Sequence, residues 1–156
     1  MRYAVLFILL FGLLAGCAPE ETAAFAEHAQ NAGMAHALDV TVYEPREDGT
    51  ILTKSKRLPW QADMEEYVLS FVLPAPDVRY ACRCENGLAY VDIAGFPTYA
   101  DARAEGAALA AVVNTLLALK HIERVELTFD GETIPTLPHG TRVNSAFSCQ
   151  IGATES

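Results

Sequence analysis

Three cysteines in the body of the chain are residues whose type and spacing could do chemistry. Cys82 and Cys84 are separated by one residue, and Cys149 lies far downstream. Alternation along a strand puts Cys82 and Cys84 on one face, which we expect to point to the core. Residues two apart on a strand lie roughly 6 to 7 Å apart, near the limit for a bridge, so a disulfide from one of them to Cys149 is favoured over one between them. The alternative is a set of buried, reduced thiols.

A zinc site is the second chemistry that these cysteines suggest, with His121 or His139 as a further ligand. Structural zinc sites use ligand pairs spaced by two to four residues. A Cys-x-Cys pair with one distant cysteine does not match that spacing. The pattern therefore argues against a metal site, and no cofactor is expected.

The other reactive side chains lack the surroundings of known catalytic motifs. The sequence contains no Gly-x-Ser-x-Gly, no His-Glu-x-x-His and no glycine-rich phosphate loop. Asp92 is expected to point to solvent or to cap a turn, and Asp101 with Glu105 is typical of a helix start. We therefore predict that the chain is not an enzyme.

Two aromatic residues near prolines, Trp60 and Tyr99, are candidates for contact with a partner. Tryptophan and tyrosine dominate the energetic centres of protein interfaces. The alternative interpretation is that both rings cover the edge of the core, because large aromatic side chains are mostly buried.

A further cysteine, Cys17, closes the apolar N-terminal run. Leu14-Ala15-Gly16-Cys17 resembles the lipobox of bacterial lipoproteins, behind a single basic residue, Arg2. The apolar stretch is too short to span a membrane, which takes about 20 residues. We expect residues 1–16 to be removed as a signal peptide and Cys17 to be acylated, so that the protein is anchored on the extracytoplasmic face of the membrane. The alternatives are an uncleaved anchor helix or cleavage by an ordinary signal peptidase.

Composition limits the partners of the mature chain. Without the leader, 140 residues remain, the size of one domain, with 10 basic and 20 acidic side chains. Phosphates and anionic lipid head groups repel such a surface, so nucleic acid is not expected as a partner and the lipid must supply the membrane attachment. Residues 17–37 have no sustained periodicity and are interpreted as a flexible tether that includes His28 and His36.

The residues after the tether predict one small α+β domain over 38–150, followed by a tail at 151–156. Asn86-Gly87 and Asp130-Gly131 predict tight hairpins. The expected order is β-β-α-β-β-α-β-β, a mixed or antiparallel sheet with two helices packed on one side. Apolar spacing and turn signals place the strands at 38–42, 50–57, 78–85, 88–94, 125–129 and 132–134, and the helices at 61–73 and 99–120.

An ordered series of short motifs runs along nearly all of 38–147. Its steps are Val42-Tyr43, Leu73-Pro74-Ala75-Pro76, Val91-Asp92-Ile93, Thr115-Leu116 and the run from Val125 to Gly131. This series resembles the GerMN domain of sporulation and spore germination, which occurs in extracytoplasmic lipoproteins. It departs from the family at Ala94, where a serine is common, and in having one copy of a domain that some members carry in tandem.

The resemblance implies a module similar to ring-building domains of secretion systems, which binds envelope proteins or further copies of itself in a sporulation- or germination-type complex. It also implies docking through edge strands and through the small-residue half of the helix at 99–120. The alternative function is binding of a cell-wall glycan or small ligand in a groove beside Trp60 and Tyr80.

Overall fold

The computed structural model describes residues 37–143 and 145–152. The chain divides into two units, 1–36 and 37–156. The predicted signal peptide, Cys17 and the tether up to residue 36 lie outside the described residues. Within the part that is described, no helix has the length and apolar character needed to cross a membrane.

The first two strands form a separate hairpin. β1 (Ala37–Pro45) and β2 (Ile51–Pro59) pair antiparallel along their whole length, from Ala37 opposite Pro59 to Pro45 opposite Ile51. The turn closes where Arg46 donates its backbone N–H to the carbonyl of Thr50 at 2.9 Å. Asp48 stabilises this turn by accepting from both the backbone N–H and the hydroxyl of Thr50.

The other three strands form a second sheet in the order β3-β4-β5. β3 (Arg79–Glu85) and β4 (Leu88–Ala94) pair antiparallel through the predicted Asn86-Gly87 turn, where both residues have positive φ, as such a turn requires. β5 (Arg124–Phe129) lies parallel to β4. The parallel pairing needs a long crossover, which the second helix provides.

Two helices connect and cover the strands. α3 (Met64–Leu69) is shorter than predicted, because residues 70–73 form turns ahead of Pro74. α4 (Ala102–Leu117) is shorter at both ends than the predicted 99–120. It begins after Asp101, whose carboxylate accepts from the backbone N–H groups of Arg103 and Ala104.

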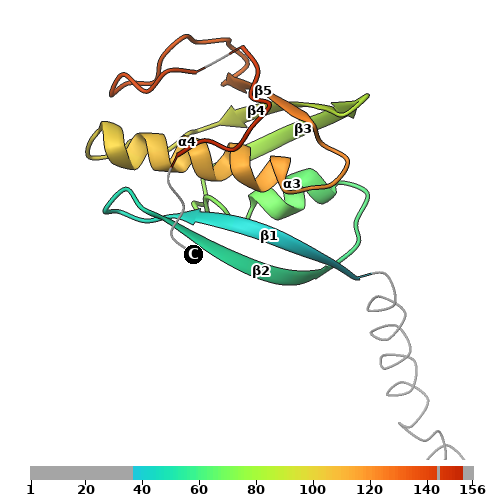
Figure 1. Ribbon diagram of the computed structural model, residues 1–156. Coiled ribbons are helices and arrows are strands. Elements are labelled where there is room, and N and C mark those ends of the chain that lie inside the picture. The colour runs from blue at the N-terminus through green and yellow to red at the C-terminus, as the bar shows by residue number, and fades with distance from the viewer. Residues whose placement is uncertain (1–36, 144, 153–156) are drawn as a thin grey trace, which may run out of the picture. The chain divides into compact units, whose positions relative to one another are not determined.

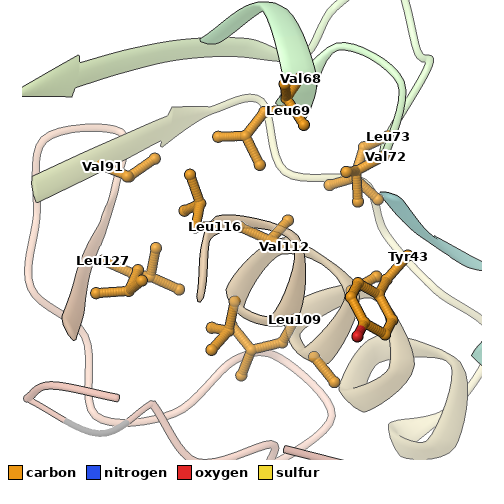
Figure 2. Close-up of a cluster of buried hydrophobic side chains, with 14 of the residues drawn as sticks. Tyr43, Val68, Leu69, Val72, Leu73, Val91, Leu109, Val112, Leu116 and Leu127 are labelled. Atoms are coloured by element: carbon orange, nitrogen blue, oxygen red, sulfur yellow. The ribbon is translucent and has the colours of Figure 1, made fainter. Parts of the chain in front are cut away.

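The helices lie between the β1–β2 hairpin and the three-stranded sheet (Figure 1). Because other elements of the domain pack against several sides of α4, 12 of its 16 residues are buried. Figure 2 shows its side chains Leu109, Val112 and Leu116 among residues of α3, β4 and β5. This position of α4 makes it the centre of the core.

The predicted α+β class and its two helices are confirmed, and two details differ. The strands form two sheets where one was expected, because α4 packs against β1 and separates the hairpin from β3-β4-β5. The predicted last strand at 132–134 is reduced to a single bridge between Phe129 and Glu132. The chain instead returns to the outer edge of β5 at Phe147, which bridges Val125.

Candidate functional site

The motif residues that carry the family resemblance hold the fold together. The Thr115 hydroxyl of α4 accepts the backbone N–H of Tyr43 in β1 at 3.0 Å, in a buried position. This hydrogen bond connects the β1–β2 hairpin to α4. A buried backbone donor without a partner would cost free energy, so Thr115 has a structural role.

Asp92 has a similar role at the far end of the three-stranded sheet. Its carboxylate accepts the backbone N–H of Gly131 at 2.8 Å and the Thr128 hydroxyl at 2.7 Å. Asp130 in turn accepts the backbone N–H of Gly95 at 3.1 Å. Asp92 therefore caps the Asp130-Gly131 turn, which is one of the two roles predicted for it.

Two buried polar residues of α4 hold the C-terminal segment. Asn114 forms a paired contact with Ile151, donating to its carbonyl and accepting from its N–H, both at 2.8 Å. Glu105 is 1% exposed and accepts the backbone N–H groups of His139 at 3.0 Å and Thr141 at 3.3 Å. The sequence indicated only a helix-start charge at Glu105. Its role in holding the C-terminal segment could not be predicted, because its partners lie more than 30 residues away.

A surface hollow beside the start of β1 is lined by an exposed tryptophan. Trp60 and Leu38 are the large hydrophobic residues exposed in the described part of the chain, at 59% and 43%. They line the same hollow of about 560 Å³, which we call the Trp60 hollow. Its other lining residues come from β1, from the turn before α3 and the start of α3, and from the residues after α4, namely Ala37, Asp39, Val40, Gln61, Ala62, Met64, Glu65, Ala118, Leu119, Lys120 and His121.

The second aromatic candidate, Tyr99, lies differently. It is half-buried, with its ring centroid 5.6 Å from that of Phe96, and its carbonyl accepts from the His139 imidazole at 2.7 Å. Burial raises the pKa of Tyr99 to about 12. These contacts match the interpretation that Tyr99 covers the edge of the core.

The groove considered beside Trp60 and Tyr80 is not one groove. Tyr80 lines a different hollow, with Pro74 and Arg79, while Trp60 lines its own. The Tyr80 hydroxyl is buried and has no hydrogen-bond partner within the described structure. Burial, followed by the nearby Tyr99, raises the pKa of this phenol. Tyr80 therefore packs inward and does not complete a site with Trp60.

All three cysteines of the body of the chain are free thiols in the structure. Cys82 is half-buried against the core as expected, whereas Cys84 near the end of β3 is exposed, which corrects its predicted burial. β3 and the segment at Phe147 lie on opposite edges of the sheet, separated by β4 and β5, or roughly 14 Å. That separation exceeds the reach of a disulfide, so the bridge to Cys149 is not formed.

Cys84 instead lies beside two residues from other parts of the fold, a combination that no sequence motif predicted. The ligand atoms of Glu65, Cys84 and His121 all lie within 4.8 Å of one another. His121 Nε2 donates to Glu65 Oε1 at 2.6 Å, since a carboxylate can only accept. We call these residues the Glu65–Cys84–His121 cluster. It shares Cys84 and His121 with the zinc site considered from sequence and leaves Cys82, Cys149 and His139 out.

Contacts within the cluster shift the pKa values of Glu65 and Cys84. Burial alone would raise the pKa of Glu65, but the hydrogen bond from His121 and others outweigh it, so the pKa lies below its ordinary value. Burial, followed by the Glu65 carboxylate beside it, raises the pKa of the Cys84 thiol to about 11. A protonated thiol is a weak nucleophile, so the cluster is not arranged to activate Cys84 for attack.

One predicted docking surface is not available. The small-residue half of α4 was expected to face a partner, but Ala104, Ala107 and Ala108 are buried. Gly106 has Thr141 within 3.9 Å of where a Cβ would lie, so the C-terminal segment approaches this part of the helix. The small residues thus serve packing within the domain.

Two helices between a hairpin and a three-stranded sheet form a small α+β domain, and this fold is similar to that of GerMN domains. Residues 69–135 match the family model Germane, described as sporulation and spore germination. This match confirms the resemblance found in the sequence.

Two solved structures share the fold. The first GerMN domain of the sporulation protein GerM from Bacillus subtilis has a TM-score of 0.60 and 17% identity, covering 71% of this chain and 97% of that one. The tandem GerMN domains of the same protein also give 0.60 and 17%, covering 72% of this chain. The chain spans about half of that tandem structure, 46% of its length. No curated protein sequence matches the chain.

Proposed function

We propose that this protein is a lipid-anchored, extracytoplasmic module that works by binding another protein, in an envelope complex of the sporulation or germination type. The fold is that of a sporulation-related domain. The motif residues have structural roles within it. The observation that carries the proposal is the exposure of Trp60 beside a hollow.

The exposed indole of Trp60 would gain free energy from burial if a partner covered it. Trp60 is 59% exposed, and Leu38 beside the same hollow is 43% exposed. Tryptophan is the residue type most enriched among interface hot spots, where it fills a desolvated pocket surrounded by polar groups. Asp39, Gln61 and Lys120 supply such polar groups around the hollow. An envelope protein that covers Trp60, or a further copy of this chain, fits this surface.

The anchor and the partner contact are separate parts of the proposal. Cys17 would carry the acyl chains, and the domain would present Trp60 to proteins at the membrane surface. Growth with an alkyne-tagged fatty acid should label the full chain and leave Cys17→Ala unlabelled. The control Cys149→Ala should label normally. Equal labelling of Cys17→Ala and the unchanged chain would remove the anchor from the proposal.

Site-specific crosslinking tests the contact. A photo-crosslinking amino acid at position 38 of the full chain, in living cells, should give an adduct of one defined mass. The adduct should be lost when Trp60→Ala is added, because the indole is the anchor of the contact. A crosslinker at position 83, on the exposed outer side of β3, is the matched control and should not give this adduct.

The outcomes separate the partners. An adduct of twice the chain mass means self-association, and an adduct with another envelope protein identifies the complex. The absence of an adduct at position 38, or the same adduct from position 83, would contradict a docking role for Trp60.

Glycan binding is the alternative that the same indole favours, because a flat exposed ring beside a hollow can stack on a sugar. This function predicts that purified peptidoglycan retains the full chain and not Trp60→Ala, with no protein adduct at position 38.

A further inference from the structure

The Glu65–Cys84–His121 cluster joins three separate parts of the fold. Glu65 lies in the first turn of α3, Cys84 lies near the end of β3, and His121 follows α4 in the connection to β5. Glu65 is the less exposed of the two hydrogen-bonded partners, with the side chains of Glu65 and His121 15% and 55% exposed. One ligand is therefore held by its surroundings and another is accessible from solvent.

The donor set is typical of a particular class of ion. Thiolate sulfur, imidazole nitrogen and carboxylate oxygen are the three protein donors that bind Zn²⁺. Hard cations such as Mg²⁺ and Ca²⁺ prefer oxygen ligands throughout, so a cysteine and a histidine select against them. This combination of side chains also differs from a surface group of carboxylates, which carries no such selectivity.

The spacing is close to that of a bound site. Ligand bonds of about 2.0 to 2.3 Å at tetrahedral angles put neighbouring donor atoms roughly 3.3 to 3.8 Å apart. In the structure these atoms all lie within 4.8 Å of one another. Cys84 and His121 are exposed, so neighbouring side chains leave theirs room to move toward an ion.

We propose that Glu65, Cys84 and His121 form a binding site for Zn²⁺ or a similar divalent transition metal, with a fourth position open to water. On binding, the Cys84 thiol loses its proton to solvent and the imidazole proton transfers through solvent from Nε2 to Nδ1. The thiolate sulfur, the Nε2 lone pair and the Glu65 carboxylate then face the ion, and one proton is released per metal bound.

Such an ion would cross-link α3, β3 and the α4–β5 connection. Glu65 and His121 also line the Trp60 hollow, so the metal would lie at its margin. Because the unfolded chain holds no preformed site, binding should stabilise the folded domain.

Cobalt titration of the full chain in detergent tests the site. Co²⁺ bound by a thiolate absorbs in the near ultraviolet, so we expect this band to saturate at one equivalent and to disappear when Zn²⁺ displaces Co²⁺. Cys84→Ser should abolish the band. His121→Gln should weaken binding by more than the roughly 10- to 100-fold that follows loss of a group outside the ligand shell.

Matched controls exist for both ligand types. Cys17→Ser, Cys82→Ser, Cys149→Ser and His139→Gln each remove a cysteine or histidine outside the cluster, and each should keep the band. Persistence of the band in Cys84→Ser, or its absence from the unchanged chain, would overturn the proposal.

A second measurement works without any variant. Zn²⁺ should slow alkylation of Cys84 in the unchanged chain, as followed by peptide mass mapping, and should leave the rate at exposed Cys149 unaltered. Equal rates at Cys84 with and without Zn²⁺ would overturn the site even if the variants fail to fold.

Discussion

Replacing Glu105 with alanine should lower the free energy of unfolding by about 2 to 4 kcal/mol. The change leaves the backbone N–H groups of His139 and Thr141 without their acceptor. A buried donor without a partner costs about 1 to 3 kcal/mol, so two donors cost about 2 to 6 kcal/mol. The alanine variant no longer buries a carboxylate, and this gain offsets part of the loss.

Equilibrium unfolding of the full chain in urea, followed by circular dichroism, measures the effect. Glu105→Gln keeps one acceptor oxygen and should lose about half as much free energy as Glu105→Ala. Glu47→Ala removes an exposed glutamate of the β1–β2 turn and should stay within about 0.5 kcal/mol of the unchanged protein. A loss below about 0.5 kcal/mol for Glu105→Ala would refute the idea that this carboxylate holds the C-terminal segment.

Three further substitutions test hydrogen bonds within the domain. Thr115→Val removes the acceptor of the Tyr43 N–H and should cost about 1 to 3 kcal/mol in urea unfolding, while Thr115→Ser should retain most of the stability. Asn114→Ala should release the C-terminal segment, so limited proteolysis should trim the variant there well before the unchanged chain. The hydroxyl and backbone N–H of Thr50 hold the pKa of Asp48 below its ordinary value, and Thr50→Val should raise that pKa in an NMR titration. Because the folded-state pKa of Asp48 is lowered, its contribution to stability is present above the ordinary pKa and is lost as the pH falls through the lowered one, and Thr50→Val should reduce this dependence.

Much of the local structure could be predicted because short-range chemistry determines it. Asn86-Gly87 tolerates positive φ at both positions, and the turn forms there. Asp101 accepts two backbone N–H groups at the start of α4, close to the helix start that Asp101 and Glu105 indicated in the sequence. The order of motifs along the chain was sufficient to find the family resemblance, although Thr115 and Asp92 bond to residues far away in the sequence.

The environment of the cysteines depends on long-range packing and could not be predicted from local patterns. Alternation placed Cys82 and Cys84 on one face correctly, but it could not tell that the core covers Cys82 and leaves Cys84 exposed. It also could not tell that β4 and β5 separate Cys149 from both. Burial along a strand depends on which helix covers it, and pairing across a sheet depends on strand order.

The Glu65–Cys84–His121 cluster likewise depends on packing between distant parts of the chain. Glu65 and His121 lie 56 residues apart in sequence, and their hydrogen bond exists only because α3 and the end of α4 meet beside β3. No spacing rule for metal ligands covers such a set. The exposure of Trp60 likewise depends on how the connection between β2 and α3 packs on the rest of the domain.

The sequence alone therefore determined the class of the domain and the position of its turns. It was also sufficient to find the family resemblance and to predict an acylated Cys17. Only the tertiary structure decided that the strands divide into two sheets, that Glu105 is a buried anchor, and that Cys84 lies beside Glu65 and His121. The physical reason is the position of α4. A helix enclosed by a hairpin, a sheet and the returning C-terminal segment brings together residues that are far apart in the chain, and their burial and hydrogen bonds follow from that packing.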